Sequence, residues 1–155
     1  MRRSPVITFF LLLLILLTVC FIFGNSLRGA EASGTQSGMV SAFLGKALGL
    51  PEEVYEGPSF GALIRMLAHM AEFALLGAEV TLLLFHLRPS RSFYLLGGLA
   101  CALTAAVDET IQFFVPGRVT ELSDLLLDTL GALLGAATVL VLLFLRRFLQ
   151  KRKSE

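Results

Sequence analysis

The stretch VDETIQFFVPGRVTELSDLLLDTLGALLG, residues 107–135, decides the fold, because it carries acidic and amide side chains inside sequence that is otherwise hydrophobic enough for a membrane. Its acidic residues are Asp108, Glu109, Asp124 and Asp128, with Glu121 between them. A charged side chain at bilayer depth costs several kcal/mol, so charged residues kept in spanning segments normally serve a function. The stretch therefore predicts a polar site within a helical membrane protein.

The composition of the whole chain indicates an integral membrane protein of one domain, residues 1–155. The 155 residues are 55% hydrophobic and 16% charged, with a mean hydropathy of +0.79, which lies outside the range of soluble globular domains. Both cysteines, Cys20 and Cys101, lie within apolar runs. We therefore expect buried free thiols and no disulfide framework.

Four hydrophobic stretches predict an all-α, four-helix membrane bundle. The expected spans cover residues 6–23, 60–87, 93–115 and 125–145, with an outer loop at 24–59 and a basic tail at 146–155. The first is long and lacks a small-x-small cleavage site, which favours an uncleaved span over a signal peptide. Apolar residues between Met39 and Leu48 recur at helical spacing. They predict either a short amphipathic helix on the membrane surface or a plain linker helix.

The basic residues set the expected orientation. Nine of the 13 lysines and arginines lie at the termini or between the second and third spans: Arg2, Arg3, Arg88, Arg91, Arg146, Arg147, Lys151, Arg152 and Lys153. By the positive-inside rule both termini are cytoplasmic, so the 24–59 loop and the turn at 116–123 lie outside. A basic tail beside a span is typical of membrane anchoring, so we expect contact with membrane lipids and no nucleic-acid partner.

This topology places the polar residues of three spans in the outer leaflet. The second span carries a stripe on one helical face, Arg65, His69, Glu72 and Glu79, of which Glu79 lies about two turns deeper and approaches the midplane. The third span adds Asp108, Glu109 and Gln112, and Arg118, Asp124 and Asp128 follow. Unpaired carboxylates in a low dielectric must take up protons, bind a cation or a cationic ligand, or stay wet. Each of these outcomes implies a pocket.

The residue types leave several roles open for this cluster. Arg65 and Arg118 would bind an anionic group, with Gln112, Asp124 and Asp128 as further ligand-binding residues. The catalytic candidates are His69, Glu72, Asp108 and Glu109, with the histidine as general acid or base. The candidate metal ligands are His69, Glu72, Asp108 and Asp128; one histidine and no nearby cysteine favour Mn, Mg or Ca over structural zinc as a cofactor. Alternatively, the cluster only ties the helices together.

Three motifs in this order resemble the VanZ-like membrane protein family: RMLAHMAEF at 65–73, DETIQFFVPGR at 108–118 and DLLLDTLGALLG at 124–135. The resemblance extends to Asn25 and Ser26 after the first span, whereas Glu79 matches no position known to us in that family. The family is named for a member linked to resistance against the glycopeptide antibiotic teicoplanin. Some relatives carry the name phosphotransbutyrylase, an acyl-transfer activity that no motif here supports.

The resemblance implies a bacterial cell-envelope protein that carries the site residues named above. Such a protein would bind or modify amphiphiles of the envelope, such as a glycopeptide or a lipid-linked wall precursor, and would lower teicoplanin binding. One alternative is a membrane-embedded hydrolase or transferase that uses His69 and carboxylates, with or without a divalent metal. The other is a purely structural polar cluster.

Overall fold

The part of the chain that the structure describes, residues 4–87, 91–118 and 122–152 of a computed structural model, consists of helices joined by short turns and contains no strand. The helices are α1 (Pro5–Ser26), α2 (Ala30–Ala47), α3 (Glu52–Tyr55), α4 (Pro58–Leu87), α5 (Arg91–Phe113) and α6 (Leu122–Arg152). The all-α fold class expected from the sequence is therefore confirmed.

Four of these helices, α1, α4, α5 and α6, are long and apolar enough to cross a membrane, so the protein is a multi-pass membrane protein. The 30 residues of α4 give a length of about 45 Å, which exceeds the hydrocarbon thickness and requires tilt or protrusion. α6 continues through Arg152 and so includes most of the basic tail expected at 146–155. α5 ends at Phe113, shortly before Pro116, which cannot continue a helix.

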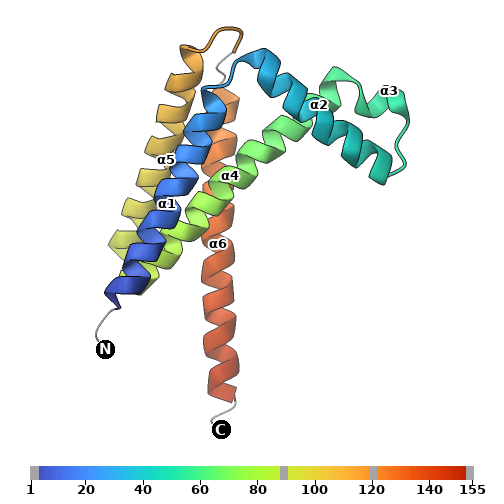
Figure 1. Cartoon of the computed structure of the whole chain (residues 1–155). Helices are drawn as coiled ribbons and strands as arrows, with labels where there is room; N and C mark the ends of the chain where they lie inside the picture. Colours follow the sequence, from blue (N-terminus) through green and yellow to red (C-terminus); the bar gives the residue numbers. More distant parts are fainter. Residues whose placement is uncertain (1–3, 88–90, 119–121, 153–155) are drawn as a thin grey trace.

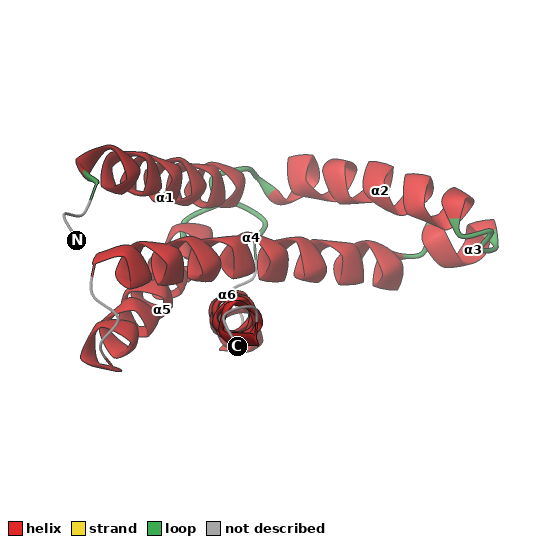
Figure 2. Cartoon of the chain, turned by 90° about the horizontal axis from the view of Figure 1, so that it is seen from below, coloured by secondary structure: helices red, strands yellow, loops and turns green. Residues whose placement is uncertain are grey.

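α4 is the central helix of the bundle and contacts α1, α5 and α6. Both ends of the described chain lie at one end of the bundle, and the end of α5 and the start of α6 lie at the other (Figure 1). When α6 is viewed along its axis, α4 runs across it and α1 lies beside α4 (Figure 2). The even number of spans agrees with termini on one side of the membrane. Which side that is remains a prediction.

Glycines allow α4 and α6 to cross with their backbones in contact. A methyl group at Gly131 would overlap the carbonyl of Met70, and one at Gly135 would overlap the carbonyl of Ala74. Small residues at such spacing let membrane helices approach closely because no bulky side chain separates the backbones, and such packing holds helices together in lipid, where there is no hydrophobic driving force between them. Gly131 and Gly135 lie four residues apart and so form a small-residue pair on the face of α6 that contacts α4.

The buried apolar core is small and lies where α1, α4, α5 and α6 meet. It is built around Ile22, Phe73, Leu76, Cys101, Ala105 and Ala132. Most other large apolar side chains on the four long helices are exposed, as expected for surfaces that face lipid. Cys20 and Cys101 are both free thiols, as predicted, although Cys20 is exposed.

The segment expected as an outer loop is mostly helical. α2 is longer than the short amphipathic helix anticipated around residues 39–48, and together with α3 it packs beside the first turns of α4 (Figure 1). A methyl group at Gly45 would overlap the ring of Tyr55, so this glycine is what lets α3 fold against α2. Met39, Val40 and Phe43 are exposed on α2, in keeping with a helix that lies at a membrane surface.

Candidate functional site

A cavity of about 640 Å³ opens between α4, α6 and the turn that joins α5 to α6. Seven polar residues line it: Arg65, His69, Gln112, Arg118, Ser123, Asp124 and Asp128. Its apolar wall includes Leu63, Met66 and Leu127. The cavity therefore combines a charged part with an apolar part, which suits a ligand that has both characters.

The inner end of the cavity is acidic and buried. Asp108 on α5 is 0% exposed and Asp128 on α6 is 1% exposed, and one atom of each lies within 4.8 Å of the other and of a ring nitrogen of His69 on α4. Among the described residues, Asp108 Oδ1, both oxygens of Asp128 and His69 Nδ1 have no hydrogen-bond partner. Buried polar groups in folded proteins nearly always have partners, so these four atoms require an explanation, and they could hold a ligand.

Gln112 connects the acidic end to the basic residues at the cavity mouth. Its Nε2 donates to Asp108 Oδ2 at 2.9 Å, with longer contacts of 3.5 Å to Glu109 Oε1 and Ser26 Oγ. The bond to Asp108 is possible because the two residues are four apart and so share a helical face. Gln112 Oε1 in turn accepts from Arg118 Nη1 at 3.5 Å. The amide thus orients one carboxylate and one guanidinium together.

Arg118 fastens the turn after α5 to the end of α1. Besides the bond to Gln112, its Nη2 donates to the carbonyl of Asn25 and its Nε to the carbonyl of Arg28, both at 3.3 Å. The turn can bring Arg118 back over the cavity because Gly117 adopts a positive φ of 77°.

The electrostatic environment of Arg118 reflects the charges around the cavity. Burial lowers the pKa of its guanidinium, and the nearby positive charge of Arg65 lowers it further. Three carboxylates raise it, those of Asp108, Glu109 and Asp124. Arginine stays charged in proteins, so the cavity mouth keeps two positive charges in mutual repulsion.

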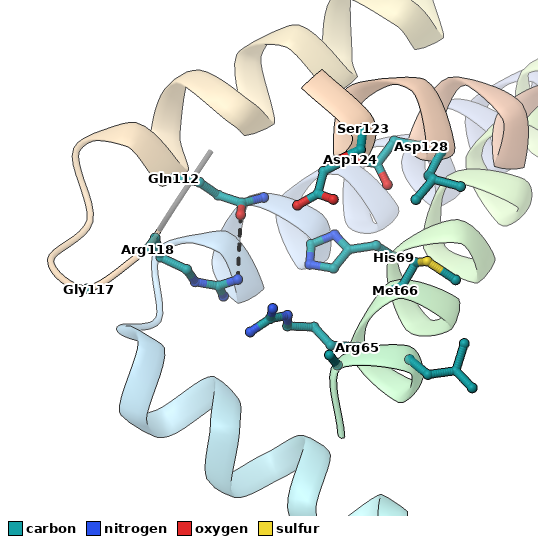
Figure 3. A pocket seen from close by; sticks show the side chains of 12 residues that line it. Arg65, Met66, His69, Gln112, Gly117, Arg118, Ser123, Asp124 and Asp128 are labelled. Atoms are coloured by element: carbon teal, nitrogen blue, oxygen red, sulfur yellow. Dashed lines mark hydrogen bonds between the residues drawn. The ribbon is translucent and has the colours of Figure 1, made fainter. Parts of the chain in front are cut away.

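Arg65 is exposed and lies where two cavities meet. The second cavity, of about 510 Å³, lies between α2, α3 and the start of α4. Figure 3 shows the guanidinium groups of Arg65 and Arg118 on one side of the first cavity, with the His69 ring and the Asp124 carboxylate across from them.

The structure divides the polar stripe expected on the second span. Arg65 and His69 line the cavity, but Glu72 faces α1, where its Oε1 accepts from Asn25 Nδ2 at 2.9 Å. Glu79 lies deeper, is 2% exposed, and accepts from Thr18 Oγ1 at 2.9 Å. Glu72 is also not a member of the three-residue group that His69 forms with the two aspartates.

The site also includes residues of α1. Nothing in the sequence had placed α1 in the site, apart from the family resemblance at residues 25–26. Asn25 and Ser26 contact the site at the C-terminal end of α1, and Thr18, earlier in the same helix, bonds to α4. The signal in the sequence was a stripe on one helical face, because Ile22 follows Thr18 by four residues and precedes Asn25 by three and Ser26 by four. Polar residues on one face of an apolar span indicate a helix contact.

Comparison with known proteins gives a match at the level of a family. A family model described as VanZ/LLP1 matches residues 9–145, from the first helix into the last, and so includes every candidate site residue. No curated protein matches the chain, and no solved structure does.

Proposed function

The chain belongs to the VanZ/LLP1 family, and we propose that it binds or modifies an amphiphile of the bacterial cell envelope in the cavity between α4 and α6. The observation that carries this proposal is the pairing of Arg65 and Arg118 at one cavity whose remaining wall is partly apolar. A ligand with an anionic headgroup and a hydrocarbon chain matches both parts.

The two arginines favour an anion such as a phosphate or carboxylate. Like charges that face one cavity repel each other, and an anion between them relieves that repulsion through charge-assisted hydrogen bonds. Arg118 is already held by three protein acceptors, so its guanidinium is preorganised. Arg65 is exposed and free to adjust to the ligand.

The apolar wall and the orientation favour a lipid-like molecule. Leu63 and Met66 on α4 and Leu127 on α6 would contact a chain that lies between the helices. In the predicted orientation the cavity is level with the outer leaflet, so a lipid-linked wall precursor could enter sideways from the membrane.

A purely structural role for the cluster is disfavoured by its unsatisfied atoms. Polar residues that tie helices together do so by hydrogen bonds, which contribute about 0.6 kcal/mol each on average in membranes. Both oxygens of Asp128 lack any such partner among the described residues. A carboxylate that makes no bond and still occupies the interior costs stability, so a ligand-related role explains it better.

Binding can be tested with an isoprenyl phosphate lipid and purified protein in nanodiscs. We expect saturable binding by native mass spectrometry that weakens by about 10-fold or more in Arg65→Gln and Arg118→Gln, because each change removes charge-assisted bonds of about 1.5–3 kcal/mol. The matched control is Arg91→Gln, an exposed arginine at the far end of α5. Equal binding by all three variants and the wild type would contradict the proposal.

A role in lowering teicoplanin binding has a cellular test. We expect expression of the wild-type chain in a susceptible bacterium to raise the inhibitory concentration of teicoplanin, and His69→Ala and Asp108→Asn to abolish that rise at unchanged protein abundance. Loss of abundance in each variant would instead support the structural role.

One observation favours a catalytic variant of this proposal. His69 lines the cavity with Nδ1 free of any partner among the described residues, so the ring could exchange a proton with a bound ligand. A hydrolase or transferase should turn over the lipid in excess of the protein and lose turnover in His69→Ala. A binding protein should show stoichiometric uptake only.

A further inference from the structure

The inner end of the cavity has the ligand set of a metal centre. His69, Asp108 and Asp128 come from three different helices, α4, α5 and α6, and each offers one atom to a group whose members all lie within 4.8 Å of one another. Ligands of one metal ion, bound at about 2.0–2.2 Å, lie about 3–4 Å apart. Small side-chain rotations would therefore bring these three atoms into a common coordination sphere.

The unsatisfied atoms point to the same place independently of that spacing. Asp128 is 1% exposed with both oxygens unpartnered, and Asp108 is 0% exposed with Oδ1 unpartnered, within the described part of the chain. His69 Nδ1 is unpartnered as well. Each of the three residues thus keeps at least one atom available to a cation.

The balance of charge also calls for a cation. Two buried carboxylates side by side cannot both stay charged in a low dielectric unless a cation neutralises them, and the bonds of Arg118 go elsewhere, to Gln112 and to backbone carbonyls of residues 25 and 28. A divalent ion bound by two carboxylates and a neutral imidazole gives a neutral unit. Such a unit removes most of the cost of burying the two aspartates.

Gln112 holds the Asp108 carboxylate in place through a hydrogen bond. Its Nε2 bonds to Asp108 Oδ2 and leaves Oδ1 of the same carboxylate to face the group. Hydrogen bonds of this kind orient carboxylate ligands in metal centres.

We propose that His69, Asp108 and Asp128 bind a divalent metal ion of the Mn²⁺ class at the inner end of the cavity. Two carboxylates and one imidazole form a mixed oxygen and nitrogen set without thiolate, which suits Mn²⁺. Three protein ligands leave coordination positions free for water or a ligand group, and two of these ligands, His69 and Asp128, border the cavity. The proposal stands apart from amphiphile binding, because a cation can bind whether or not a lipid enters.

Manganese titration of the purified full-length protein tests the site. Protein treated with chelator and then dialysed is titrated with Mn²⁺, and the free ion is followed by its electron paramagnetic resonance signal. We expect a single saturable Mn²⁺ per chain, and affinity at least about 10-fold lower in Asp128→Asn and His69→Gln, the lower end of what even an outer-shell change costs. The matched control is Asp124→Asn, which lines the same cavity but is not one of the three residues.

Two outcomes of the titration would overturn the proposal. One is the absence of stoichiometric Mn²⁺ binding to folded wild-type protein, and the other is an equal loss of affinity in Asp124→Asn and Asp128→Asn. A measurement on the wild type alone guards against misfolded variants: pulsed spectroscopy of the bound Mn²⁺ should show coupling to an imidazole nitrogen. Bound ion without that coupling would also contradict the proposed ligand set. None of these results depends on whether an amphiphile binds.

Discussion

Replacing Asp128 by asparagine should raise the free energy of unfolding of the protein, although it weakens metal binding at the cavity. The Asp128 side chain is 1% exposed, and neither oxygen has a partner among the described residues. Burying an unpaired carboxylate costs several kcal/mol, whereas an asparagine of nearly the same shape leaves a neutral amide unpaired at about 1–3 kcal/mol. The difference predicts a free energy of unfolding higher by about 1–3 kcal/mol in metal-free protein.

The assay is an SDS titration of purified protein in mixed micelles, followed by far-ultraviolet circular dichroism. The matched comparison is Gln112→Met, a change of similar size at a residue whose amide bonds to both Asp108 and Arg118. That change should lower the free energy of unfolding by about 1–3 kcal/mol, since it strands two charged groups.

The two substitutions are therefore expected to change the free energy of unfolding in opposite directions. Residues that exist for function often reduce stability, and their removal raises it. If Asp128→Asn lowered the free energy of unfolding by 1 kcal/mol or more, as Gln112→Met is expected to do, the reasoning would be refuted and the polar cluster would be structural.

Three further predictions concern packing, helix contacts and orientation. Gly135→Leu should lower the free energy of unfolding by at least about 1–3 kcal/mol, because the leucine side chain would overlap α4. Gly98→Ala is the control: there is open space at its Cβ, so it should have little effect in the same SDS titration. Thr18→Val, which removes the hydroxyl bond to a buried carboxylate on α4, should cost about 1–3 kcal/mol, and a stability equal to wild type would contradict the α1 contact. In a background without native cysteines, cysteine at the exposed Gln36 should react with an impermeant reagent from outside, and cysteine at the exposed Ser92 only from inside; the reverse pattern would invert the topology.

The spans could be predicted from the sequence because hydrophobic length alone determines them. A charge-free run such as residues 6–23 has no other stable location than a bilayer, and α1 covers it with a few residues to spare. The close contact at Gly131 and Gly135 was also visible as a small-residue pair.

From the sequence, the site residues could be grouped only within a single helix, not between helices. Helical spacing showed that Arg65, His69, Glu72 and Glu79 share a face of α4, but a face is wide enough to touch two neighbours. Arg65 and His69 turn toward α6 and the cavity, while Glu72 and Glu79 bond to α1. Which neighbour each residue meets depends on how the helices cross, and that is set by backbone contacts between helices.

How the helices cross also decides that His69 lies close to Asp108 and Asp128. This proximity depends on the relative rotation of α4, α5 and α6, which no spacing within a single helix encodes. The contribution of Asn25 and Ser26 was underestimated because two polar residues at the end of an apolar span are equally typical of a plain helix terminus.

The most direct test of the central claim, that this cavity binds an anionic amphiphile, is site-specific photo-crosslinking at two adjacent leucines. A photoreactive leucine analogue in place of Leu127 would face the cavity, and the same analogue in place of Leu126, which is 63% exposed and lies outside the cavity lining, would face lipid at nearly the same depth. We predict that an isoprenyl phosphate in nanodiscs crosslinks preferentially at position 127, and that Arg65→Gln with Arg118→Gln removes the preference. Equal crosslinking at the two positions, or a preference that survives loss of both arginines, would contradict the account.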